Sequence, residues 1–315
     1  MRTLLLFLLC FGVLLFVPVA YAQQITPFDL SISPAVVEIA VKPGKLVTQA
    51  FSVENAGSVD LEVRPVLREF RSDDQTGSPI LEDTNSFPYA SLQNANQALD
   101  TPFTLRSNSS EQLVLALNIP EDAQERDWYI ALLLQTRPSK STPVIGSGSQ
   151  ITGQIAANVL VRVTNTNQVP HQWAVTLKGV PKFIDSLQSI TVTPIVSNTS
   201  KSMAVPELHL VVLDSKKAIV HEQDGLPDRV LAQSSREIFA AKQRKDDPRS
   251  YEPTSFTFDP LFAVGPYTVR ATIRNGADGP VVTEQSYIAF PFSLCIAGTS
   301  LGGLVWLSRK LRRKR

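Results

Sequence analysis

Apolar and polar residues alternate with a period of two along most of the chain, and helical periodicity is scarce between its two ends. The segments 46–57 (LVTQAFSVENAG) and 59–70 (VDLEVRPVLREF) are typical of half-buried strands. The side chains expected to face inward are Val47, Phe51, Val53, Leu61, Val63, Val66 and Phe70, with Ala50 fitting the first strand imperfectly. Turn-forming residues separate the strands and no helix is expected between them, which indicates antiparallel sheets.

The same pattern continues through 127–136 (DWYIALLLQT) and 151–163 (ITGQIAANVLVRV), which are typical of a hairpin. It pauses near Asn167 and resumes at 173–180 (WAVTLKGV). Both halves contain a strand, an Asn-rich turn and another strand, as a loose repeat. We therefore predict an all-β fold with two immunoglobulin-like antiparallel β-sandwich domains, at 23–166 and 167–287, followed by a C-terminal transmembrane helix.

The N-terminus has the layout of a secretory signal peptide at 1–22. Arg2 precedes an apolar run, and Ala20 and Ala22 form the small-x-small triplet after which cleavage is expected, so that Gln23 becomes the first residue. An uncleaved N-terminal anchor is the alternative.

The C-terminal segment 288–307 (IAFPFSLCIAGTSLGGLVWL) carries no charge. At about 1.5 Å rise per residue its helix would match the roughly 30 Å hydrocarbon layer, so we predict a membrane span, with a buried core helix or a pair of strands as the alternative. The basic tail 308–315 is predicted to be cytoplasmic, with Arg309, Lys310, Arg312, Arg313, Lys314 and Arg315 as the stop-transfer signal. Gly298 and Gly302 have the Gly-x-x-x-Gly spacing of close helix pairing, which would permit a weak homodimer.

The distribution of charge argues against nucleic-acid binding. Arg2 and the six basic residues of the tail leave 23 of the 30 Lys and Arg residues for the exported part, against 29 acidic residues. Cys10 and Cys295 both lie in the terminal apolar segments, so the exported part has no thiol for a disulfide or a Cys-based metal site. We expect a single-pass cell-membrane protein with an extracytoplasmic N-terminal part, of a bacterial envelope.

The chain carries no sequence motif of catalysis, and we expect neither an enzyme nor a metal or cofactor site. The candidate ligand contacts are Asp127, Trp128 and Tyr129, because aromatic faces and a carboxylate suit a carbohydrate. The alternative is structural, since one of two consecutive aromatic residues on a strand must face the core. The insertions 71–102 and 242–253 are long for sandwich connections and are either binding loops or solvated segments.

The order of parts resembles the WxL-interacting proteins of Gram-positive cell walls, and the first domain resembles the immunoglobulin-like domain of pilus-assembly chaperones. The residues that carry the resemblance are VKPGKLVTQAFSVENAGSVDLEV, the strand pair at 127–136 and 151–163, and GPYTVRATI at 265–273. The resemblance implies a first domain that binds peptidoglycan and a second that binds a host.

Two functions follow. The first is a non-enzymatic, membrane-anchored envelope protein whose sandwiches bind cell-wall polymer or another surface protein, in adhesion or scaffolding. The alternative is a chaperone-like assembly factor for secreted or surface subunits that acts by β-strand addition.

Overall fold

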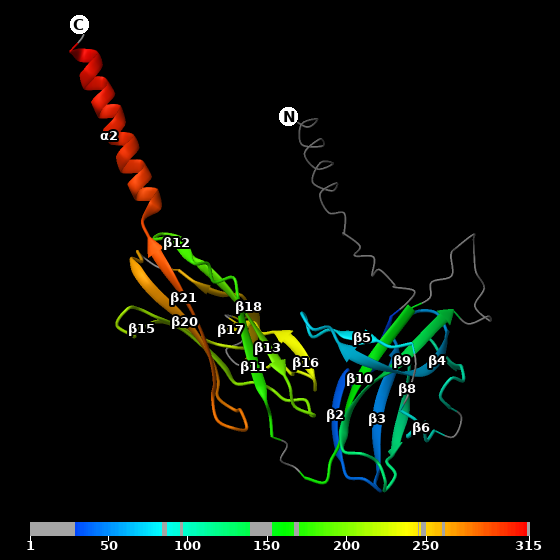
Figure 1. Ribbon diagram of the computed structural model, residues 1–315. Helices are drawn as coiled ribbons and strands as arrows, with labels where there is room; N and C mark the ends of the chain where they lie inside the picture. Colours follow the sequence, from blue (N-terminus) through cyan, green and yellow to red (C-terminus); the bar gives the residue numbers. More distant parts are fainter. Residues whose placement is uncertain are drawn as a thin grey trace, which may run out of the picture.

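The computed structural model describes residues 29–83, 87–94, 97–138, 153–166, 170–244, 246, 250–259 and 262–313. Strands form two successive pairs of sheets, and a single helix follows them in this part of the chain (Figure 1). The predicted all-β architecture of β-sandwiches is confirmed. The predicted signal peptide and its cleavage residues Ala20, Ala22 and Gln23 lie outside the described residues.

The first sandwich is built from the strands up to β10. Its first sheet has the order β1 (Leu30–Ser33), β3 (Leu46–Asn55), β8 (Ser109–Asn118), β6 (Ala90–Leu92). Its second sheet has the order β2 (Val36–Val41), β10 (Gly153–Val163), β9 (Arg126–Pro138), β4 (Leu61–Ser72), and β4 also pairs with β5 (Pro79–Leu81) and β7 (Phe103–Leu105). The chain passes from one sheet to the other between β1 and β2, at Pro34.

The period-two pattern explains the core of this sandwich. Phe51 and Val53 on β3, and Leu61 and Val63 on β4, are fully buried between the two sheets, as the sequence predicts. Each alternate residue faces the other way, because successive side chains on a strand point to opposite faces.

The second sandwich repeats this architecture. One sheet has the order β11 (Trp173–Lys178), β13 (Ile190–Asn198), β16 (Ser234–Glu237), with β19 (Phe256–Phe258) also paired to β13. The facing sheet has the order β12 (Phe183–Asp185), β21 (Val281–Phe290), β20 (Gly265–Ile273), β14 (Leu208–Leu213), β15 (Ile219–Asp224). A separate ribbon of β17 (Ala240–Gln243) and β18 (Tyr251–Thr254) includes the two ends of the second predicted insertion.

A buried asparagine ends the equivalent strand of each sandwich and accounts for the loose repeat in the sequence. Asn55 at the end of β3 donates to the carbonyl oxygens of Val59 (2.9 Å) and Arg106 (3.0 Å). Asn198 at the end of β13 donates to those of Ser202 (2.9 Å) and Val230 (3.1 Å). In both places the buried side-chain amide connects the turn to a second segment of the chain through backbone carbonyl oxygens.

The two sandwiches meet through a third apolar cluster. Val66, Phe70, Ala131, Leu133 and Leu160 from the outer face of the second sheet pack with Met203 and Leu231 of the second sandwich. Val66 and Phe70 therefore do not share the inner face with Leu61 and Val63, as the sequence pattern suggested, since β4 is buried on both faces here. The last strand of the first sandwich ends at Val163, and the first strand of the second begins at Trp173. The predicted boundary between residues 166 and 167 lies in this interval, next to residues 167–169, which are outside the described part of the chain.

The predicted membrane span is wrong. Ile288, Ala289 and Phe290 belong to β21, so the helix α2 (Phe292–Arg312) begins only after Pro291. The apolar stretch that remains is diluted by Gly, Ser and Thr, and in the described part of the chain no helix is long and apolar enough to cross a membrane. The predicted location, a single-pass membrane protein with a cytoplasmic tail, depended on this span and is therefore wrong as well.

The basic residues predicted as a stop-transfer signal belong to the end of this helix. Arg309, Lys310 and Arg312 lie in its last turn, where cations interact favourably with the helix dipole, and Arg313 follows. Lys314 and Arg315 lie outside the described residues. Pairing of helices through Gly298 and Gly302 stays a prediction.

Candidate functional site

One strand of the first sandwich has a free edge. β10 pairs with β9 along its whole length, from Gly153 to Val163. On its other side β2 pairs with it in parallel, but only from Asn158 onward. Across the described ranges, no strand pairs with 153–157 on that side. An unpaired edge is a template for another strand, because its N–H and C=O groups have no ladder partner.

The direction of the free backbone groups follows from the hydrogen bonds farther along β10. The N–H of Asn158 donates to the carbonyl oxygen of Ala35 (2.8 Å), and the N–H of Thr164 donates to that of Val41 (3.0 Å). Backbone groups alternate sides along a strand, so those of Gln154 and Ala156 point to the same side as Asn158, away from β9. These two residues therefore present the unpaired donors and acceptors.

Apolar side chains line the inner side of this edge. Ile155 is half-buried against the core, and Ala157 is fully buried. The neighbouring strand of the facing sheet, β1, comes within 8 Å of β10 between Cα atoms, but its pairing is with β3. Leu30 and Ile32 on β1 are likewise half-buried against the same core. A strand added at the edge would find apolar contacts on its inward face.

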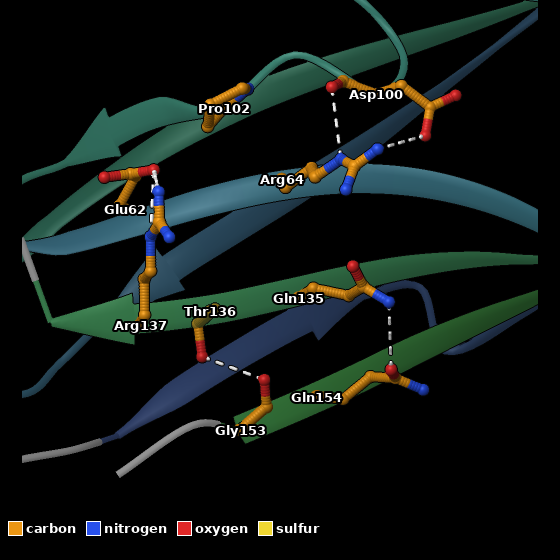
Figure 2. A pocket seen from close by; sticks show the side chains of 9 residues that line it. All are labelled: Glu62, Arg64, Asp100, Pro102, Gln135, Thr136, Arg137, Gly153 and Gln154. Carbon is orange, nitrogen blue, oxygen red and sulfur yellow. Dashed lines mark hydrogen bonds and ion pairs between the residues drawn. The ribbon is translucent and has the colours of Figure 1, made fainter. Parts of the chain in front are cut away.

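A polar hollow of about 580 Å³ lies beside the edge on the outer face of the sheet. Figure 2 shows its walls, which come from β4, β9, the start of β10 and the loop before β7. Its lining residues are Glu62, Arg64, Asp100, Pro102, Gln135, Thr136, Arg137, Gly153 and Gln154.

Two ion pairs neutralise the charges of the hollow. The Nε of Arg137 donates to Glu62 Oε1 (3.1 Å), and this bond raises the pKa of the Arg137 guanidinium. Arg64 donates from Nη2 to Asp100 Oδ1 (3.1 Å) and from Nε to the carbonyl oxygen of Asp100 (3.1 Å). The N–H of Asp100 in turn donates to the carbonyl oxygen of Pro65 (2.8 Å). A proline is tolerated within β4 because its nitrogen lies on the side away from β9.

A cross-strand pair of amides connects the hollow to the free edge. Gln154 lies opposite Gln135 in the register of β10 and β9, and Gln135 lies opposite Arg64 in that of β9 and β4. The Nε2 of Gln135 donates to Oε1 of Gln154 (3.5 Å), at the long limit for such a bond. Gln154 is exposed, whereas Gln135 is half-buried.

Two of the three predicted ligand contacts lie between the sandwiches. The carboxylate of Asp127 is almost fully buried and accepts bonds from the N–H of Met203 (2.6 Å) and the hydroxyl of Ser202 (2.9 Å). It also faces Arg162 Nε at 3.6 Å. The hydroxyl of Tyr129 donates to Asp127 (3.2 Å) and accepts from the N–H of Ala232 (2.9 Å). Burial, followed by the charge of Asp127, raises the pKa of the Tyr129 hydroxyl above its usual range.

Trp128, the third predicted contact, points to the other face of β9. Its ring packs edge-on against Phe87 (5.2 Å between centroids) and Tyr89 (6.4 Å). The guanidinium of Arg126 covers it at 3.4 Å from the ring centroid. The structure thus gives all three residues partners within the protein, while a ligand at these positions stays a prediction.

The first insertion also contacts the second sandwich. The N–H of Glu237 on β16 donates to the carbonyl oxygen of Gln75 (2.8 Å), and the N–H of Ser235 donates to Asp74 Oδ1 (3.3 Å). Part of this predicted binding loop therefore covers an edge strand of the same chain. The free edge of β10 was missed because the alternation in ITGQIAANVLVRV predicts a strand but not how far β2 accompanies it.

No family model matches the sequence, and no curated protein matches it. Solved structures with a similar fold include the class 5 fimbriae chaperone CfaA, at 8% identity and a TM-score of 0.42, over 82% of this chain and 99% of that one. The chaperone DraB of E. coli is 12% identical, with a TM-score of 0.37, over 84% of this chain and 98% of that one.

The chaperone–tip adhesion subunit complex CsuC–CsuE of Acinetobacter baumannii is 11% identical, with a TM-score of 0.36, over 66% of this chain and 89% of that one. These solved structures are of pilus-assembly chaperones, the class of protein that the first domain's sequence resembles. No match supports the WxL-interacting family, a cell-wall polymer or adhesion. We draw no function from a likeness at these scores.

Proposed function

We propose that this protein is a non-enzymatic binding protein that takes up an extended segment of another protein by β-strand addition to residues 153–157 of β10. The observation that carries the proposal is the free edge, where Gln154 and Ala156 present unpaired backbone groups beside apolar side chains. This is the chaperone-like function that the sequence offered as the alternative, and we now prefer it to the binding of cell-wall polymer.

The edge sets the length of the added segment. β2 occupies the edge from Asn158 onward, so a strand of about five residues, roughly 16 Å long, fits before it. Its inward side chains would lie near Ile155, Leu30 and Ile32 and should be apolar. Main-chain bonds would supply most of the affinity and the alternating side chains the selectivity.

The test uses the full-length chain and two fluorescent peptides, TVQVAVT and TVAVQVT. The second is the first in reverse order, so that a parallel or an antiparallel strand can place Gln and Ala on the outward face and Val on the inward face. Binding is followed by anisotropy and by amide hydrogen exchange. We expect slower exchange at Gln154 and Ala156 on binding, because their N–H groups become ladder donors.

The perturbing variant is Ala156→Pro, which removes an outward N–H and leaves the bonds to β9 in place. We expect peptide affinity to fall at least about fivefold, the loss of one hydrogen bond and of close approach. The matched control is Glu222→Pro on β15, which is also an edge strand and pairs only with β14 in its sheet. The N–H of Gly225 donates toward β14, to Leu208, and that of Leu226 donates to Phe239 on the other side. Because N–H groups alternate sides along a strand, the N–H of Glu222 points away from β14. Equal affinity of both variants, or no protection at Gln154 and Ala156, would refute strand addition.

A further inference from the structure

The glutamine pair beside the edge ends with a free donor. Gln154 accepts from Gln135 through Oε1, and Figure 2 shows its Nε2 turned away from Gln135. Gln154 is exposed, and no other described residue forms a hydrogen bond with this amide nitrogen. Because β9 lies on one side of β10 and the free edge on the other, the Nε2 donors are available to a side chain that arrives at the edge.

The outward side chain of an added strand would lie next to Gln154. Neighbouring strands are about 4.8 Å apart, and directly opposed side chains on one face come within hydrogen-bonding reach. An amide at that position would accept from Gln154 Nε2 and extend the row of Gln135 and Gln154 by one more amide, as in the amide ladders of stacked strands.

The surrounding charges favour a neutral polar side chain. Arg137 and Arg64 are already paired with Glu62 and Asp100, so the hollow offers no unpaired charge to an incoming carboxylate or ammonium group. A charged side chain would lose hydration at the edge without a partner of opposite sign. An aliphatic side chain would displace water from the Gln154 donors without replacing its hydrogen bonds.

The next outward position has the opposite character. Ala156 lies opposite Leu133, and Leu133 lies opposite Val66, both of which are 2% exposed. A side chain beside Ala156 therefore continues an apolar row across the sheet.

We infer that the edge selects strands with a Gln or Asn side chain opposite Gln154, two residues away from a small apolar residue opposite Ala156. The inference rests on the proposed function and names its partner class, an extended protein segment with an amide and a small apolar residue at alternate positions. Gln154 is the residue that determines the selectivity.

The experiment compares the two peptides above with versions that carry Asn, Leu, Glu or Lys in place of Gln. With the full-length chain, we expect the Gln and Asn peptides to bind about two- to tenfold more tightly than the other three, the range of one net hydrogen bond. In Gln154→Leu this preference should vanish. Gln112→Leu, which removes an exposed glutamine from β8 in the opposite sheet, should keep it.

The outcomes separate the two levels of the proposal. If no peptide binds, or binding ignores Ala156→Pro, strand addition itself fails. If peptides bind at the edge but the Glu, Lys or Leu versions match or exceed the Gln version, or Gln154→Leu keeps the preference, amide selection is overturned while strand addition stands.

Discussion

Replacing Asp127 by alanine should loosen the junction between the two sandwiches without unfolding either of them. The carboxylate is 2% exposed and accepts bonds from Met203 and Ser202 of the second sandwich, while it lies on β9 of the first. Asp127→Ala leaves the buried N–H of Met203 without an acceptor and Arg162 without its counter-ion. The apolar cores of the two sandwiches do not include this residue.

The expected loss is about 3 kcal/mol of coupling free energy. The Asp127 carboxylate accepts two hydrogen bonds from the second sandwich, and a hydrogen bond to a charged group contributes about 1.5–3 kcal/mol, of which we take the lower end for each. That is roughly a hundredfold change in the equilibrium between docked and separated sandwiches. Ser202→Ala removes only the hydroxyl donor and should cost about 1.5 kcal/mol.

The assay is urea unfolding followed at one tryptophan at a time. Trp128 reports on the first sandwich and Trp173 on the second, so each is kept in turn while the other tryptophans are changed to Phe. In Asp127→Ala the two transitions should move apart, and small-angle scattering should show a wider range of inter-sandwich distances. Unchanged midpoints with coincident transitions would show that the third apolar cluster alone holds the sandwiches together.

Two further predictions concern the second sandwich. Gly179→Ala should destabilise it by more than about 2 kcal/mol in thermal unfolding, because a Cβ at this position, with a φ of +85°, would lie 2.4 Å from the Thr191 carbonyl oxygen. Gly279→Ala, at a φ of +105° but with open space around the added Cβ, should cost about 1 kcal/mol, and equal losses of stability in the two variants would refute the steric reason. Asp185 accepts from the N–H (2.7 Å) and hydroxyl (3.0 Å) of Ser293 at the start of α2, and the bond from this N–H lowers the pKa of its carboxyl below 3.8. The stabilisation that the ionised Asp185 gives to the start of α2 is present above pH 3.8 and is lost as pH falls through the lowered pKa. Amide exchange in the first turn of α2 should therefore become faster in acid and in Asp185→Asn. A first turn whose exchange does not respond to acid in this way would contradict the role of Asp185.

The sequence predicts strands well where one face is buried and poorly where both are. Phe51 and Val53 were placed correctly because β3 is a strand with one apolar face. Val66 and Phe70 were placed on the wrong face, since a second domain covers the outer side of β4 and a single sequence does not contain that contact. The prediction of a membrane span at 288–307 was wrong for a related reason. Ile288, Ala289 and Phe290 belong to β21, and their apolar side chains are those of a strand and not of a membrane helix.

The candidate site depended on pairing more than on residue type. Asp127, Trp128 and Tyr129 stand out in the sequence because they are large and polar or aromatic, and the fold uses them in contacts within the protein. Gln154 and Ala156 do not stand out, and their importance comes only from the point at which β2 leaves β10.

The same hairpin carries the junction and the free edge at its opposite ends. Arg162 lies opposite Asp127 near one end, and Gln154 lies opposite Gln135 near the other. The eight residue steps from Gln154 to Arg162 span about 26 Å of strand. A five-residue strand at the edge would stop where β2 begins, short of Arg162 and Asp127, although Ala156 lies beside Leu133 of the third apolar cluster. An added strand takes the backbone groups of Gln154 and Ala156 that point away from β9, whereas the second sandwich is held by Asp127 and by side chains such as Leu133 on β9. Binding at the edge therefore uses different groups of the sheet from docking, which is why a peptide that binds Gln154 and Ala156 need not separate the two halves of the protein.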